Sequence, residues 1–228
     1  MSEWWTYQLS DLLLFSPQTY YRLFELYNTD IWPMQILTLA LGVSILALIH
    51  WNPPWHGRVV TAILAACWLW VAWAYHLQRY ATINWAATYF AATFAIEAAL
   101  LIWIGVIRAR LVFLPTTRAL YRVGIIIYLF ALIALPFISP LVGRKWVQAE
   151  IFGIAPDPTA IATLGLLLLA SGRTYWELLL IPLLWCATTG AILWTMGSPD
   201  TYIVPLAGLL AMVISIYKTR LLRNRQSK

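Results

Sequence analysis

Glu97 is the residue whose type and position point most directly to chemistry. It is the only acidic residue of a long apolar stretch, fourteen positions after Ile83 and eleven before Arg108. If that stretch crosses a bilayer, an ionised carboxylate at its middle costs about 2.5–3.5 kcal/mol, so such acids usually face a bundle interior or a water-filled cavity. Thr93, one turn earlier, could donate a hydrogen bond to it. Two roles stay open for Glu97: a proton or cation relay, or a protonated acid that holds two helices together.

Polar residues also gather between the apolar stretches, at what we predict to be the outer face. Three acids stand at the mouths of separate stretches, where they are either solvated loop charges or a vestibule that attracts cations. A histidine and an arginine follow another stretch on the same face. The candidate residues of a substrate or ion pathway are Glu97, Thr93, His76, Arg79, Asp30, Asp157 and Asp200.

The sequence gives no support to an enzyme or a metal site. All three histidines precede residue 77, and the chain has no His-Glu-x-x-His, no P-loop and no dinucleotide glycine fingerprint. Cys67 and Cys186 both fall inside apolar stretches, so we expect helix packing rather than a disulfide framework, with a soft-metal pair as the alternative. We predict no catalytic residues, no metal and no cofactor.

The composition requires lipid as a solvent. Hydrophobic residues make up 62% of the 228 residues and charged residues only 11%, whereas soluble globular proteins carry about 25% charged residues. The 14 tryptophans and 12 tyrosines are the types that collect at membrane–water interfaces. The net charge of +6 lies beside the apolar stretches and at the C-terminus, so anionic lipid explains it and we expect no nucleic-acid partner.

Seven apolar stretches approach the roughly 20 residues that a helix needs to cross a bilayer. The predicted fold is therefore an all-α, polytopic membrane helix bundle with seven transmembrane helices. The fifth stretch is the least regular, because its uncharged run ends at Ser171 and Pro156 and Pro158 would kink it. The predicted spans are residues 31–50, 59–77, 83–107, 123–142, about 151–171, 177–196 and 202–217.

Residues 1–30 read as an interfacial segment before the transmembrane domain of residues 31–217 and the basic tail of residues 218–228. Ser16 and Pro17 form a helix start, and residues 17–28 then repeat apolar residues at helical spacing. That face consists of Tyr20, Leu23, Phe24 and Tyr27. It either lies flat on the outer membrane surface or packs on the protein itself.

Charge asymmetry predicts the orientation. Four of the 15 Lys and Arg residues fall on one side of the predicted spans, namely Arg22, Arg79, Arg144 and Lys145, and the other eleven fall on the opposite side. The positive-inside rule then places the C-terminus in the cytoplasm and the N-terminus outside. The similar turns at Gly57-Arg58 and Gly172-Arg173 suggest a 3+1+3 arrangement, in which the fourth span links two three-helix units.

Three segments resemble an uncharacterised bacterial family of multi-spanning membrane proteins, known as a domain of unknown function. These are Asp11-Leu12-Leu13-Leu14-Phe15-Ser16-Pro17, the stretch from Tyr20 to Asn28, and the stretch from His76 to Trp85. The resemblance covers nearly the whole chain. It implies a location in the bacterial inner membrane and implies no activity.

Two functions compete on these grounds. The intramembrane acid, the acidic outer mouth and the faint repeat favour a small-solute or ion transporter or channel. The short loops and the scarcity of polar residues in the spans favour a non-transporting accessory or assembly subunit of a larger membrane complex. The expected partners are the lipid bilayer and either further copies of the chain or the subunits of such a complex.

Overall fold

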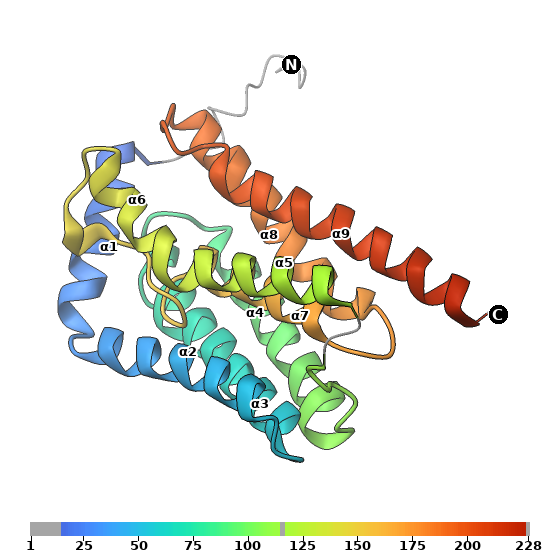
Figure 1. Ribbon diagram of the computed structural model, residues 1–228. Helices are drawn as coiled ribbons and strands as arrows, with labels where there is room; N and C mark the ends of the chain where they lie inside the picture. Colours follow the sequence, from blue (N-terminus) through green and yellow to red (C-terminus); the bar gives the residue numbers. More distant parts are fainter. Residues whose placement is uncertain (1–14, 115–116, 227–228) are drawn as a thin grey trace, which may run out of the picture.

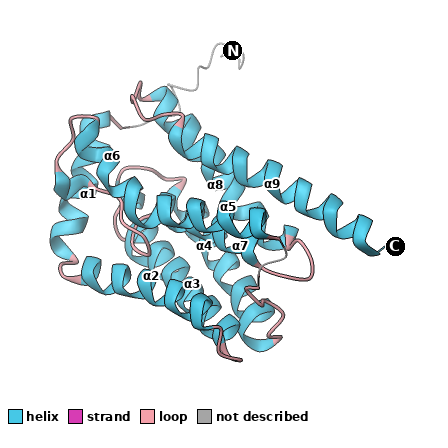
Figure 2. Cartoon of the chain, viewed as in Figure 1, coloured by secondary structure: helices cyan, strands magenta, loops and turns pink. Residues whose placement is uncertain are grey.

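The computed structural model describes residues 15–114 and 117–226, and these residues are helical almost throughout (Figures 1 and 2). Among them, six helical segments are long and apolar enough to cross a membrane. Three of these segments contain π-helical turns, a form that is often found near functional sites. The six segments are α2 (Met34–Trp51), α3 with η3 (His56–Trp70, Val71–Leu77), α4 with η5 (Ala87–Leu101, Ile102–Ile107), α5 with η6 and α6 (Arg118–Leu129, Phe130–Ala134, Leu135–Leu141), α8 (Trp176–Thr195) and α9 (Ile203–Gln226).

The all-α, membrane-type bundle is thus confirmed, and the predicted count of seven spans is approximate. The fifth predicted span is α7 (Pro156–Leu169), a helix of 14 residues whose side chains are all buried. At 1.5 Å per residue α7 is about 21 Å long, shorter than the roughly 30 Å of bilayer hydrocarbon. It packs against α5, α8, α9 and α3 (Figure 1). The protein interior, rather than lipid, therefore surrounds α7.

Two glycines let α5 and α7 approach backbone to backbone. A Cβ atom on Gly165 would lie 2.8 Å from the Tyr128 nitrogen, and one on Gly124 would lie 2.8 Å from the Gly165 carbonyl oxygen. Small residues allow this kind of close helix contact in membranes. The fourth predicted span therefore packs directly on α7.

The N-terminal helix α1 (Pro17–Asp30) forms as predicted. The Ser16 hydroxyl caps it by accepting a hydrogen bond from the Thr19 amide at 3.2 Å. Its predicted apolar face is buried against the protein, where the Phe24 ring lies 5.2 Å from that of Tyr75. Helix α1 thus covers one end of the bundle, far from the end of α9 (Figure 1). Residues 1–14 of the predicted interfacial segment lie outside the described residues.

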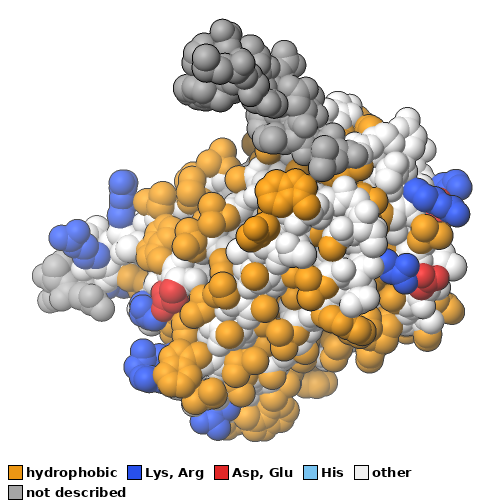
Figure 3. All heavy atoms as spheres, turned by 180° about the vertical axis from the view of Figure 1, so that it is seen from behind, with side chains coloured by type: hydrophobic (Ala, Val, Ile, Leu, Met, Phe, Trp, Pro, Cys, Tyr) orange, Lys and Arg blue, Asp and Glu red, His pale blue; other side chains and the backbone are white. Residues whose placement is uncertain are grey.

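Apolar side chains are spread over the face of the molecule seen in Figure 3, and charged side chains lie toward its two ends. Large apolar residues such as Trp73, Trp103 and Trp194 are exposed on the helices, and Trp85 is exposed in the turn before α4. Such a surface suits a bilayer, with lipid against the apolar belt and water at the charged ends.

Candidate functional site

The candidate site lies at the N-terminal end of α7, where four charged residues meet. Arg144 and Glu150 come from the segment before α7, Asp157 from its first turn, and Asp200 from the turn before α9. They line a cavity of about 20 Å³ together with Ser139 and apolar side chains. A cavity of this size holds about one water molecule.

Asp157 is the most deeply buried member of the cluster. Its Oδ1 atom accepts hydrogen bonds from Trp185 Nε1 at 2.6 Å and from the Thr189 hydroxyl at 2.8 Å. Two donors and the positive end of a helix dipole all favour the ionised carboxylate. The sequence folds this way locally because Pro156 starts α7 without requiring a partner for its own nitrogen.

Arg144 and Asp200 form an ion pair whose side chains are only 10% and 8% exposed. The Arg144 guanidinium also lies 4.4 Å from the ring centre of Tyr21. The Tyr21 hydroxyl is 2.6 Å from the Ser198 hydroxyl, which in turn donates to Asp200. Helix α1 and the turn before α9 therefore fix the pair in position.

Glu150 is an acid of the cluster with a buried, unsatisfied oxygen. Its Oε2 atom is buried and lacks a hydrogen-bond partner among the described residues, as do Nε and Nη1 of Arg144. Burial and the negative charge of Asp157 raise the pKa of Glu150 well above its usual range, and Arg144 opposes this shift. Because two neighbouring acids do not both ionise readily, Glu150 and Asp157 can share one exchangeable proton.

The C-terminal end of α7 holds a second buried charge. Lys218 of α9 turns inward and donates hydrogen bonds to the carbonyl oxygens of Leu167 at 3.0 Å and Leu168 at 3.2 Å, and also to that of Ala170. These carbonyls belong to the negative end of the helix dipole. Helix α7 thus has an acid at its first turn and a lysine at its last carbonyls.

Glu97 stands apart from both charged ends. Its side chain is fully buried, and neither carboxyl oxygen has a hydrogen-bond partner in the described part of the chain. Thr93 is exposed, and its hydroxyl donates to the Phe90 carbonyl at 2.8 Å. The hydrogen bond that we expected between Thr93 and Glu97 is therefore not formed, because the Thr93 hydroxyl bonds to the backbone of its own helix instead.

His76 is buried among aromatic rings. Its own ring lies 4.6 Å from Phe94 and 5.1 Å from Trp185, and both ring nitrogens lack hydrogen-bond partners among the described residues. Trp185 connects this histidine to the cluster, because its indole nitrogen donates to Asp157. His76 therefore lies next to the site without reaching the carboxylates.

The seven predicted residues thus separate into distinct places. Asp157 and Asp200 come together, whereas Asp30 pairs with Arg79 at 2.6 Å in an exposed position. The sequence prediction missed Arg144 and Glu150 as site residues, and it assigned Lys218 to the basic tail. In the described residues, no group of three or more His, Cys, Asp or Glu side chains could hold a metal ion.

The fold and the site define a polytopic helical membrane protein with a buried acidic pair at the end of a short, enclosed helix. The chain belongs to the family described as "Family of unknown function (DUF6064)", which matches residues 17–227. The family resemblance expected from the sequence is thereby confirmed. No curated protein and no solved structure matches the chain.

Proposed function

We propose that the protein is a small membrane transporter or channel that moves protons, or a solute coupled to protons, through the acidic pair Glu150 and Asp157. The observation that carries this proposal is that both acids line one water-sized cavity at the end of α7. Buried acids at membrane depth are expensive, and they mark ion pathways and proton relays in many membrane proteins.

The chemistry of the pair suits proton exchange. Trp185 and Thr189 hold Asp157 ready as a carboxylate, while burial favours the protonated form of Glu150. A proton could pass between them, or to a water molecule in the cavity, without creating a second isolated charge. Many secondary transporters likewise have an interrupted helix whose N-terminal, positive end points at the binding site.

Two observations favour this pair over Glu97 as the proton site. Glu97 has no hydrogen-bond or ion-pair partner among the described residues, and it is not one of the residues that line the cavity. A proton on Glu97 would therefore have no neighbouring group that could receive it. Glu97 remains our second candidate for a relay, deeper in the bundle.

The orientation that we propose places this site at the outer face of the bacterial inner membrane. The support is the distribution of cations, eleven toward the C-terminal face and four toward the face that carries Arg144. Protons would then reach the pair from outside the cell.

One observation supports the alternative of an accessory subunit. An apolar groove of about 310 Å³ lies between α8 and α9, lined by Leu183, Cys186, Ala187, Pro205, Gly208, Leu209 and Met212. Small residues along such a groove are typical of helix–helix contacts in membranes. A partner helix could pack there, and transport would then not be a property of this chain alone.

Proton flux into proteoliposomes tests the proposal. The purified chain is reconstituted with a pH-sensitive dye inside the vesicles, and a potassium–valinomycin potential drives proton entry. We expect flux above that of empty vesicles, with Asp157→Asn abolishing it because the amide cannot carry a proton. Asp30→Asn is the matched control, since Asp30 lies in an exposed ion pair. Equal flux in Asp157→Asn and wild type, or none in wild type, would contradict the proposal.

A further inference from the structure

A second pocket, separate from the acidic pair, opens between α1 and the turn that follows η3. It has a volume of about 440 Å³. Two arginines, Arg22 from α1 and Arg79 from the turn, stand on its walls, and four uncharged polar side chains and three apolar ones complete it. The remaining lining residues are Gln18, Thr19, Leu23, Leu26, Gln78, Thr82 and Ile83.

An acid holds each of the two guanidinium groups in place, but most of their N–H donors stay available. Arg22 donates through Nη1 to Glu25 at 2.6 Å, and Arg79 donates through Nη2 to Asp30 at 2.6 Å. A guanidinium carries five N–H donors, so each pair leaves several for a ligand. The acids therefore hold the arginines at the pocket and still permit an anion to bind.

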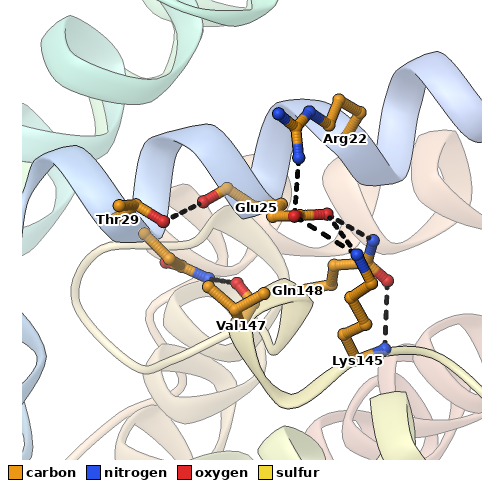
Figure 4. Close-up of polar contacts among 7 residues, drawn as sticks. Arg22, Glu25, Thr29, Lys145, Val147 and Gln148 are labelled. Carbon is orange, nitrogen blue, oxygen red and sulfur yellow. Dashed lines mark hydrogen bonds and ion pairs between the residues drawn. The ribbon is translucent and has the colours of Figure 1, made fainter.

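The ionic network beside Arg22 carries a net positive charge. Glu25 accepts hydrogen bonds from Lys145 and Gln148 as well as from Arg22 (Figure 4). Desolvation raises the pKa of Glu25, but the Lys145 hydrogen bond and the Arg22 charge outweigh it and lower the pKa, so Glu25 stays ionised at neutral pH. Two cations thus share one carboxylate, and the network keeps one net positive charge.

The surroundings of the pocket indicate where its ligand comes from. Three large apolar side chains near the pocket are exposed, namely Trp73, Leu77 and Leu26. Leu26 lies on the pocket wall, and the other two precede Arg79 by less than two helical turns, further into the span. Exposed tryptophan and leucine directly below arginines are typical of the level at which lipid headgroups meet acyl chains. A ligand with a phosphate at the arginines could therefore lay its apolar part along these side chains.

We propose that this pocket binds the phosphate headgroup of an anionic phospholipid, such as phosphatidylglycerol. Arginine matches phosphate because its planar fork donates two parallel hydrogen bonds to two oxygens. The lipid would join α1 to the turn after η3 at the bilayer surface. This proposal is independent of the acidic pair.

Hydrogen–deuterium exchange in nanodiscs tests the assignment. The full chain is placed in phosphatidylcholine discs with increasing phosphatidylglycerol, and exchange is followed in α1 and in residues 78–83. We expect slower exchange as phosphatidylglycerol increases. The double variant Arg22→Gln/Arg79→Gln should need at least roughly tenfold more of this lipid, because it loses two charged contacts and a single one is worth about that factor. Arg118→Gln/Arg122→Gln, two exposed arginines at the other end, is the matched control and should behave like wild type.

Two further measurements show whether the phosphate comes from a lipid or a soluble ester, and whether the double variant is folded. Glycerol phosphate is added to discs of phosphatidylcholine alone, and protection equal to that of phosphatidylglycerol would overturn the lipid assignment in favour of a soluble phosphate ester. Unchanged exchange in α8 shows that the double variant is folded. No response of the wild type to phosphatidylglycerol, or the same response in the folded double variant, would overturn the proposal.

Discussion

At the scale of single residues, the molecule tolerates buried polar groups of two kinds. Asp157 and Lys218 are buried with two and three hydrogen bonds, respectively, so their charges are supported. Glu97 is buried with no hydrogen-bond partner among the described residues. A buried polar group without a partner costs free energy, whereas a well-satisfied one contributes to stability. The two kinds respond differently to substitution.

Replacing Glu97 by methionine should stabilise the protein. Methionine has a similar length and removes an unpartnered carboxyl group, a gain of about 1–3 kcal/mol in the free energy of unfolding. Glu97→Gln is the control, because its amide stays without a partner and should change little. Thermal unfolding of both variants in detergent measures the difference. A lower unfolding temperature for Glu97→Met than for Glu97→Gln would mean that the carboxyl group has a partner and is not dry.

At the scale of elements, α7 depends on its two charged ends. Its last carbonyls lie inside the protein, where water cannot replace a missing donor, and Lys218 supplies that donor. The helix is also too short to span the bilayer hydrocarbon, and protein rather than lipid surrounds it. Its stability is therefore tied to the side chains that cap it from neighbouring helices.

Lys218→Met should destabilise the fold by about 1–3 kcal/mol, because three carbonyl oxygens lose a charged donor that water cannot replace. The gain from no longer burying an ammonium group offsets part of this loss. Arg223→Met, an exposed cation on the same helix, is the matched control and should change stability little. Thermal unfolding monitored by circular dichroism measures both. Equal unfolding temperatures would contradict the capping role.

The sequence predicted where the helices lie better than it predicted whether their faces contact lipid, water or protein. The apolar face of α1 could be derived because polar residues alternate with it, and Asp157 and Asp200 could be placed at one end from span order alone. The burial of α7 could not, because lipid and protein interior are equally apolar and a uniformly apolar helix does not distinguish them. A lysine at the end of a span is expected to extend toward water, and the sequence does not show that Lys218 instead turns inward to α7.

At the scale of the whole molecule, the distribution of cations is the support for the orientation that we propose. Arg144 and Lys145 lie in the segment before α7, near α1, whereas most cations lie toward the end of α9. The membrane potential and the insertion machinery retain positively charged loops on the cytoplasmic side. The site at Glu150 and Asp157 would then face outward, and the basic end of α9 would face the cytoplasm.

Site-directed labelling in whole cells tests this orientation. Lys145→Cys and Arg223→Cys place thiols at two exposed positions, while the native Cys67 and Cys186 are buried and should not react. A membrane-impermeant maleimide should label position 145 in intact cells and position 223 only after the cells are permeabilised. Because α9 crosses the bundle only once after α8 returns to the outer end, labelling of both positions from outside would require an even number of crossings between them. That result would contradict a transmembrane α7 and a cytoplasmic end of α9, whereas labelling of position 145 only after permeabilisation would contradict the outward-facing acidic pair.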